Sequence, residues 1–156
     1  MQNASMCYAF AVGWIPAPGE PGARNRLNPN SAEAHYSYAA FLAGLGKDDE
    51  YISQLQRLLQ LRPDYPYGEL RLADAFFAKG EFDKAKMHYL AAIRINPNET
   101  AAYNNLGKLY LTQGQVSQAV VQFNEALRLN PQYKEAEENL RVAKAADAEI
   151  FPAAHR

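Results

Sequence analysis

The sequence contains few of the residues from which catalytic and metal sites are built. Its 156 residues include one cysteine, Cys7, which excludes an internal disulfide and a multi-cysteine metal site. The three histidines, His35, His88 and His155, lie too far apart in the sequence to form a helical pair of metal ligands. Glycine-rich phosphate loops and nucleophile elbows are also missing. We therefore expect that this chain is not an enzyme and that it holds no cofactor and no metal ion.

An excess of charge and long hydrophobic runs are lacking as well. Lys and Arg total 16 against 17 for Asp and Glu, so a net charge of -1 provides no long-range attraction for nucleic acid or an anionic membrane. No stretch reaches the roughly 20 apolar residues that a membrane helix requires. The apolar run at residues 6–15 has no basic residue before it, so a secretory signal is a weak interpretation. Together with the single cysteine, this pattern favours a cytoplasmic location.

A helical hairpin is indicated in residues 100–133. Apolar residues recur there at spacings of three and four in two stretches, Tyr103, Leu106, Leu109 and Tyr110, and then Val120, Phe123, Leu127 and Leu129. Between them, Gly114 suits the left-handed conformation that ends a helix, and the hydroxyl of Ser117 can cap the next helix. Pro131 then stops that second helix. The pattern predicts two amphipathic helices joined by a tight turn.

The turn, cap and stop residues of this hairpin recur at steps of 34 residues. The equally spaced sets are Pro29, Pro63, Pro97 and Pro131; Gly46, Gly80 and Gly114; and the predicted caps Asp49, Asp83 and Ser117. Stacked copies of one hairpin require all three features at one period, whereas independent helices do not. The copies span residues 32–65, 66–99 and 100–133, and a charged helix at residues 134–149 is predicted to cap the last one.

These copies resemble the tetratricopeptide repeats (TPR), a family with this period. In residues 100–133 the key positions of the family hold Tyr103, Leu106, Gly107, Tyr110, Gly114, Ala119, Phe123, Ala126 and Pro131. Residues 66–99 match similarly, with Glu69 in place of a large aromatic residue. Residues 32–65 diverge most, because Tyr51 and Leu58 stand where the pattern has alanine. The resemblance implies an all-α fold, a right-handed α-solenoid of three TPR hairpins plus a C-terminal capping helix over residues 31–149.

Two segments fall outside the repeats. Residues 1–30 are expected to form a non-repeat arm, which either folds back on the first hairpin or is the remnant of a divergent repeat in a longer array. The remnant interpretation rests on Arg26-Leu27-Asn28-Pro29, which resembles the end of each later repeat, and on the prolines before it, which would break a helix. Residues 150–156 are expected to fray.

The first helix of each repeat is predicted to turn one face toward a concave groove. The candidate peptide-binding residues on or beside this face are Tyr36, Tyr67, Leu70, Arg71, Asp74, Phe77, Asn104, Asn105, Lys108, Leu111 and Asn139. Three apolar residues on this face have two possible roles: Tyr67, Leu70 and Phe77. They either form an exposed patch for partner side chains or are buried between hairpins by the curvature of the stack. By the resemblance, Asn105 and Asn139 belong to a ladder that bonds an extended peptide backbone, and the alternative for Asn105 is a hydrogen bond between helices.

These features predict a scaffold or adapter that binds a protein or peptide partner, as an extended peptide or a helix in the groove. Tyr36 and Ala40 occupy the positions where family members that clamp a terminal carboxylate carry Lys and Asn, so we do not expect that mode. Two alternatives stay open. In the first, the chain is a substrate-docking lobe or fragment of a larger enzyme such as a glycosyltransferase. In the second, it is a module for self-association.

Overall fold

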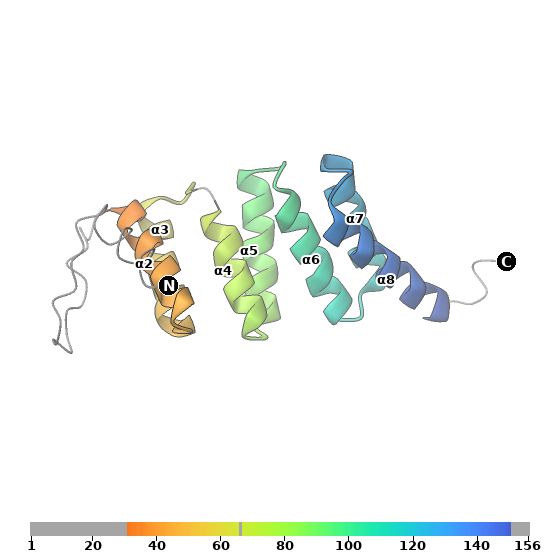
Figure 1. Ribbon diagram of the computed structural model, residues 1–156, viewed down its shortest axis with the longest axis horizontal. Helices are drawn as coiled ribbons and strands as arrows, with labels where there is room; N and C mark the ends of the chain where they lie inside the picture. The colour runs from red at the N-terminus through yellow and green to blue at the C-terminus, as the bar shows by residue number, and fades with distance from the viewer. Residues whose placement is uncertain (1–30, 66, 151–156) are drawn as a thin grey trace, which may run out of the picture. The chain divides into compact units, whose positions relative to one another are not determined.

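All secondary structure in the described part of the chain is α-helical (Figure 1). The computed structural model describes residues 31–65 and 67–150. Its helices are α2 (Ala32–Gly44), α3 (Asp48–Leu61), α4 (Gly68–Ala78), α5 (Phe82–Ile95), α6 (Thr100–Thr112), α7 (Val116–Leu129) and α8 (Lys134–Ile150). The predictions for the arm at residues 1–30, Cys7 included, and for the tail from residue 151 lie outside the described residues. The all-α prediction is confirmed.

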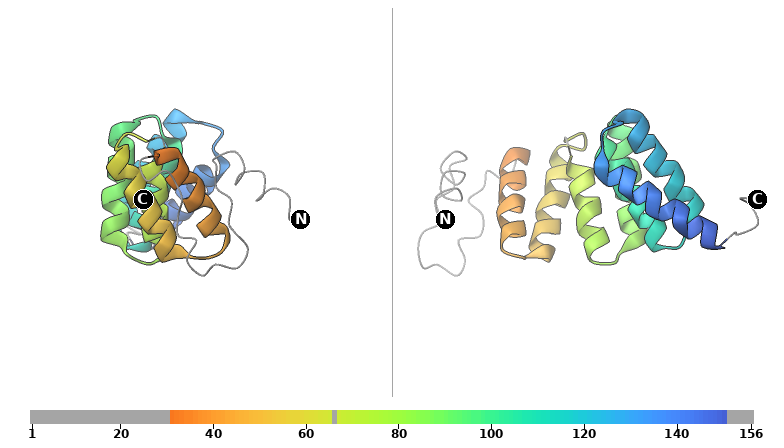
Figure 2. Two further views of the ribbon diagram at one scale, coloured as in Figure 1. Left: turned by 90° about the vertical axis from the view of Figure 1, so that its left-hand side faces the viewer. Right: turned by 45° about the vertical axis from the view of Figure 1, so that its right-hand side comes forward.

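The helices belong to two compact units. The first unit extends to Gly68 and contains the hairpin of α2 and α3, and the second begins at Glu69 and contains the helices from α4 to α8. Consecutive helices within each unit run antiparallel, as Figure 2 shows for α2 with α3. In the second unit α6 contacts α5, α7 and α8. Within residues 31–65 and 67–150, no helix has the length and apolar character to cross a membrane.

Each hairpin turn is closed at a glycine with positive φ. The φ angles are 67° at Gly46, 75° at Gly80 and 71° at Gly114, a region that side chains other than glycine rarely enter. After α6, the N–H of Gly114 donates to the carbonyl of Leu111 (3.0 Å), and the N–H of Gln115 donates to that of Tyr110 (2.8 Å). This pair of bonds satisfies carbonyls at the end of the helix. The predicted role of the three glycines is therefore confirmed.

The predicted cap residues are wrong by two positions. The residues that cap the second helix of each hairpin are Lys47, Glu81 and Gln115, and none makes a side-chain capping bond. The backbone N–H of each of these residues already bonds the end of the preceding helix, so one residue ends one helix and begins the next. Asp49, Asp83 and Ser117 consequently fall inside the first turn. There the two carboxylates interact favourably with the helix dipole.

Each hairpin has a large buried side chain at one position of the second helix and a small residue at one position of the first helix. The large residues occupy one repeat position and are fully buried, Leu55, Tyr89 and Phe123. The small residues occupy another, Ala39, Ala73 and Gly107. A Cβ added at Gly107 would lie only 2.5 Å from Cε1 of Phe123, so the aromatic ring fills the space beside the glycine backbone. The absence of a side chain at residue 107 thus lets α6 and α7 approach closely.

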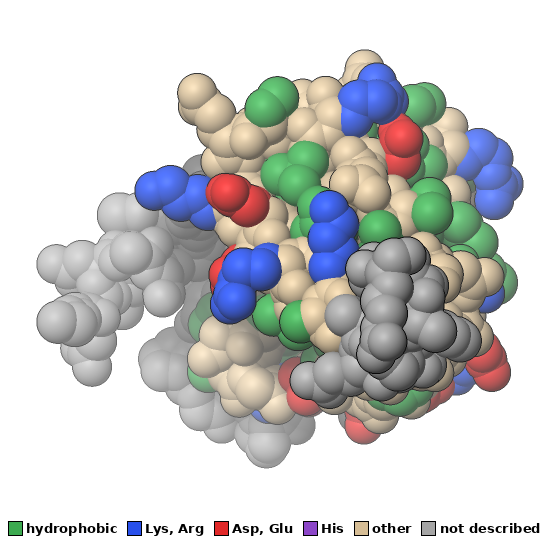
Figure 3. Space-filling model, turned by 90° about the vertical axis from the view of Figure 1, so that its right-hand side faces the viewer, with side chains coloured by type: hydrophobic (Ala, Val, Ile, Leu, Met, Phe, Trp, Pro, Cys, Tyr) green, Lys and Arg blue, Asp and Glu red, His purple; other side chains and the backbone are tan. Residues whose placement is uncertain are grey.

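The last helix covers α7 with one face and presents a charged face outward. Ala136 and Ala143 are fully buried, and α8 contacts α7. On the opposite side of α8, Arg141 and Glu138 form an exposed ion pair at 2.6 Å, and Val142 is exposed. Figure 3 shows basic and acidic side chains mixed with hydrophobic ones on this side of the molecule. This distribution fits a helix that ends the stack.

Candidate functional site

In the second unit, hydrogen bonds between side chains join α4, α6 and α8 into one wall. From α6 to α4, Nδ2 of Asn105 donates to Oδ1 of Asp74 at 2.8 Å. From α8 to α6, Nδ2 of Asn139 donates to Oδ1 of Asn104 at 2.9 Å. Asn104 and Asn105 are themselves in contact at 3.3 Å, so one chain of polar groups runs across the three helices. We call this set of four residues the amide row.

Asp74 anchors the amide row at α4. Its Oδ1 accepts hydrogen bonds from Asn105 and from the hydroxyl of Tyr89, each at 2.8 Å, and the guanidinium of Arg71 lies 3.9 Å from Oδ2. Burial raises the pKa of Asp74, and the two hydrogen bonds and Arg71 offset only part of that rise. Burial, and then the neighbouring carboxylate, raise the pKa of Tyr89, so its hydroxyl remains a donor. Asp74 therefore holds α4, α5 and α6 together.

Lys108 and Glu135 form an ion pair at the surface of the wall. The ammonium of Lys108 lies 3.0 Å from Oε1 of Glu135, and about half of each side chain is exposed. The hydrogen bond from Lys108 is the main cause that lowers the pKa of Glu135. An exposed pair of this kind contributes little to stability. Either charge can therefore be redirected to a ligand at small cost to the fold.

The other predicted residues of the second unit differ in exposure. Leu70 and Asn104 are buried, with exposed fractions of 5% and 0%. Phe77 is half-buried, and its ring lies 5.7 Å from that of Phe82 at an angle of 56°. Leu111 is also half-buried. The exposed apolar surface on α4 is therefore smaller than the predicted patch, because Leu70 does not contribute to it.

The amides predicted to bind peptide backbone also make hydrogen bonds between helices. The bond from Asn105 to Asp74 joins two helices, as the alternative interpretation of Asn105 predicts. The oxygen of Asn105 also accepts from Asn104, but a carboxamide has two N–H donors and an oxygen with two lone pairs, so one donor and one lone pair remain. Asn139 is half-buried, and its bond to Asn104 uses one of its two N–H donors. The helix contacts fix the orientation of these amides and leave further bonds open to them.

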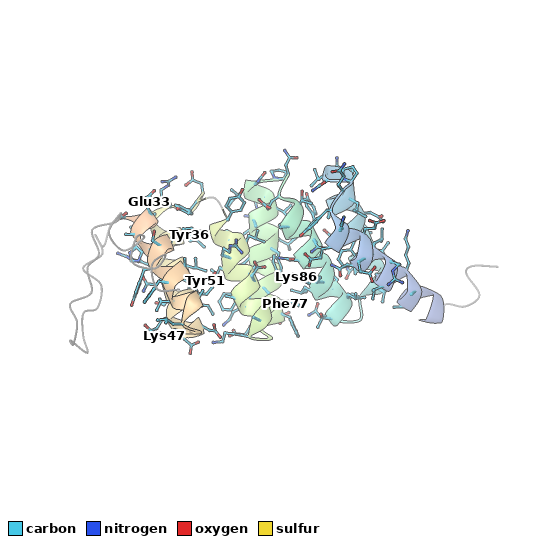
Figure 4. The ribbon with its side chains drawn as sticks, viewed as in Figure 1. Glu33, Tyr36, Lys47, Tyr51, Phe77 and Lys86 are labelled. Atoms are coloured by element: carbon cyan, nitrogen blue, oxygen red, sulfur yellow. The ribbon has the colours of Figure 1, made fainter. Side chains whose placement is uncertain are left out.

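In the first unit, Tyr36 and Tyr67 line a pocket of about 330 Å3 together with Glu33, Arg62 and Tyr65. The rings of Tyr36 and Tyr65 lie 5.3 Å apart at 39°. Burial, and then the carboxylate of Glu33, raise the pKa of Tyr65. Figure 4 shows Glu33 and Tyr36 near the amino-terminal end of α2. We call these five residues the tyrosine pocket, and it brings together two of the predicted site residues.

Sequence reasoning missed Arg62 and Tyr65, because they follow the second helix and the prediction considered only first helices. One signal in the sequence could have found Tyr65. Tyr133 occupies the same repeat position two periods later, so a tyrosine recurs two residues after the helix-stopping proline. The two tyrosines make different contacts: Tyr65 lies against Tyr36 of its own repeat, whereas the hydroxyl of Tyr133 lies 3.4 Å from Oε2 of Glu135 in the following helix.

The two described histidines take part in hairpin packing. Nδ1 of His35 lies 2.8 Å from Oε1 of Gln54, and Nδ1 of His88 lies 2.6 Å from Oε2 of Glu69. The two pairs each join the first and second helix of a hairpin. Among the residues that the structure describes, no three His, Cys, Asp or Glu side chains group closely enough to hold a metal ion.

Comparison with known proteins identifies the repeats. Residues 73–114 match a family described as TPR repeat, and residues 100–133 match the tetratricopeptide repeat. Protein STIP1 homolog of Dictyostelium discoideum is 27% identical over 71 residues, which are 46% of this chain and 13% of that protein. The chain therefore corresponds to only a small part of that relative.

Solved structures share the fold. The first TPR of Spaghetti (RPAP3) bound to the HSP90 peptide SRMEEVD has a TM-score of 0.73 at 24% identity, covering 78% of this chain and 96% of that one. The Sgt2 TPR domain from Aspergillus fumigatus has a TM-score of 0.72 at 16% identity, covering 80% and 84%. At these identities the likeness is one of fold, the all-α TPR solenoid. With the repeat matches in the sequence, it shows that the chain contains tetratricopeptide repeats, which the family models place at residues 73–133.

Proposed function

We propose that the chain is an adapter, without catalytic activity of its own, that binds an extended peptide segment of a partner protein along α4, α6 and α8. A tetratricopeptide repeat protein is a protein–protein interaction module, and the proposal concerns how this one holds its partner. The wall supports an extended ligand because it is a row of parallel binding elements, each a first helix of a repeat.

The amide row is the observation that carries this proposal. An extended peptide presents one N–H and one C=O per residue, and a carboxamide can pair with both, whatever the peptide sequence. Asn105 and Asn139 are oriented in advance by their bonds to Asp74 and Asn104. A side chain that is ordered before binding loses less conformational entropy when the ligand arrives, which favours affinity.

The surroundings of the amide row support a peptide of mixed character. Phe77 offers part of an aromatic ring on α4, and the ion pair of Lys108 and Glu135 offers a charge of either sign. The RPAP3 structure contains an acidic HSP90 peptide. For this chain we do not propose an acidic C-terminal peptide, because Tyr36 and Ala40 occupy the positions where a carboxylate clamp carries Lys and Asn.

The proposal is tested by partner capture with the immobilised full chain, followed by mass spectrometry. The test variant combines Phe77→Ala with Asn105→Ala, and the control is Met87→Ala, which removes an exposed apolar side chain from the second helix α5. We expect the double variant to lose partners that the wild type and the control retain. Thermal unfolding of each variant shows whether the fold persists.

Retention of the same partners by a folded double variant would remove the wall from the binding site. A second comparison separates a direct role of Asn105 from its structural role. Asp74→Asn keeps an oxygen that accepts from Asn105 and Tyr89, so capture should survive this change if the amides themselves contact the ligand. Loss of capture with Asp74→Asn and a retained fold would assign the contact to the carboxylate instead.

A further inference from the structure

The tyrosine pocket has the composition of a site for a cation. Three of its five lining residues are tyrosines, and the other two are Glu33 and Arg62. Its volume of about 330 Å3 is at the lower end of the range for ligand pockets, which is large enough for one long side chain. The five residues come from the first turns of α2 and from the segment after α3, so one hairpin builds the site by itself.

The aromatic rings give the pocket walls a preference for positive charge. The faces of tyrosine rings carry partial negative charge and attract ammonium and guanidinium groups within about 6 Å. The structure already contains one such contact, because the guanidinium carbon of Arg62 lies 5.7 Å from the centre of the Tyr65 ring. Tyr36 is tilted against Tyr65, and Tyr67 is 55% exposed, so further ring surface is accessible.

The charged groups beside the rings are predominantly acidic. Nη1 of Arg62 lies 3.2 Å from Oε1 of Glu33, and its Nε lies 3.6 Å from Oδ1 of Asp64. One positive charge thus faces two negative charges, which leaves this group of three with a net charge of -1. An anion would meet an arginine that is already neutralised twice. A cation could pair with Glu33, because Arg62 is also paired with Asp64.

The backbone around Tyr67 is held in an unusual conformation. Its φ of 63° lies in the left-handed region, which bulky residues seldom adopt. The turn is held at Gly68, whose N–H donates to the carbonyl of Tyr65 at 3.1 Å and whose backbone lies close to the side chains of Leu58 and Leu59. Residues held in this region concentrate at binding sites, where the surrounding structure determines them. Here the conformation places Tyr67 in the pocket lining.

We propose that the tyrosine pocket binds the cationic side chain of an arginine or lysine in a partner peptide. The ligand cation contacts the tyrosine faces and pairs with Glu33. The inference rests on the proposed function for its assumption that the ligand is a peptide. It adds the chemistry of one ligand residue, and its test needs no natural partner.

The test titrates the full chain, with isotope-labelled tyrosine rings, with three blocked tripeptides. The probe is acetyl-Gly-Arg-Gly-amide, and the comparison peptides carry Glu or Pro in place of Arg. We expect saturable shifts of the tyrosine ring signals with the Arg peptide at millimolar concentration, and none with the Glu peptide. Glu33→Gln and Tyr36→Leu should each lower the affinity for the Arg peptide by about threefold, which corresponds to the loss of one exposed cation contact.

The control is Tyr38→Leu. Tyr38 is on the same helix, but its ring lies against Phe41 and outside the pocket. This change should leave the affinity for the Arg peptide within experimental error. Glu33 is exposed, so Glu33→Gln is informative even if Tyr36→Leu impairs folding. Saturation by the Glu peptide, or Arg affinity that is unchanged in Glu33→Gln, overturns the proposal. Saturation by the Pro peptide alone overturns it as well and assigns the tyrosines to a proline-rich ligand.

The two proposals fail separately. If the chain captures a partner through the wall but ignores the Arg peptide, only the cation site is refuted. If the Arg peptide binds and the wall variant captures the same partners as the wild type, only the role of the wall is refuted.

Discussion

The close contact between Gly107 and Phe123 predicts that Gly107→Ala destabilises the second unit. A Cβ at residue 107 would lie 2.5, 2.7 and 3.0 Å from three atoms of the Phe123 ring. Carbon atoms are in favourable contact at about 3.5 to 4.0 Å, so the overlap is about 1 Å. Phe123 is fully buried, so its ring cannot move into solvent to relieve it.

Two opposing effects set the magnitude. Replacing a mid-helix glycine by alanine stabilises a helix by about 1 kcal/mol. Overpacking a tight core contact costs about 1 to 3 kcal/mol. The net loss of unfolding free energy for Gly107→Ala is therefore about 1 kcal/mol, and urea unfolding monitored by circular dichroism measures it. The matched control is Gly44→Ala at the end of α2, where an added Cβ would meet nothing within 4 Å and should not destabilise.

A double-mutant cycle attributes the effect to the ring. Phe123→Leu removes Cε1 and Cζ, two of the three atoms that an added Cβ would meet, so Gly107→Ala should cost less in that background, with a coupling energy of about 1 kcal/mol. If Gly107→Ala, like Gly44→Ala, did not destabilise the protein, the helices α6 and α7 would not be in close contact at this position. Additive effects of the two substitutions would refute the role of the ring.

Three further predictions concern the wall and the hairpin core. Burial raises the pKa of Asp74 above 3.8, so its folded form binds more protons, and this residue's contribution to stability falls as pH rises through 3.8 and above. Asp74→Asn should therefore gain stability relative to wild type on going from pH 3 to pH 7 in thermal unfolding, and an unchanged difference would contradict this. Lys108→Met should raise the pKa of Glu135 toward its usual value, as NMR titration would show, and lower stability by less than about 0.5 kcal/mol. Ala119→Leu should cost about 1 to 3 kcal/mol in urea unfolding, because the site is fully buried, and equal stability would mean loose packing.

The repeat could be predicted from the sequence because its signals are local. A glycine with positive φ and a proline after the helix act on their own backbone, so Gly46, Gly80 and Gly114 could be assigned their conformation from spacing alone. The caps could not be assigned in this way. Whether Ser117 caps α7 depends on where α6 ends, and the turn is so tight that Gln115 serves both helices.

The candidate site was only partly predictable, because its side chains contact residues from other helices. The partner of Asn105 is Asp74, one repeat earlier, and nothing in the local pattern distinguishes an amide that bonds a helix from one that awaits a ligand. Arg62 and Tyr65 line the pocket because the segment after α3 folds beside α2. Helical periodicity does not describe such segments, so the prediction could include Tyr36 and Tyr67 but not Arg62 and Tyr65.

The amide row and the tyrosine pocket are suited to different parts of a peptide. Carboxamides pair with backbone groups that every peptide has, so a wall built on them alone would give affinity with little selectivity. Selectivity is a difference between two affinities, and it requires a group that penalises the wrong ligand. Glu33 provides such a group, because an acidic ligand side chain in the pocket would face its carboxylate and an arginine that Glu33 and Asp64 already pair. Under the two proposals, each unit therefore has its own recognition chemistry: the amides of the second unit bind backbone of any sequence, and the pocket of the first unit prefers a basic side chain to an acidic one.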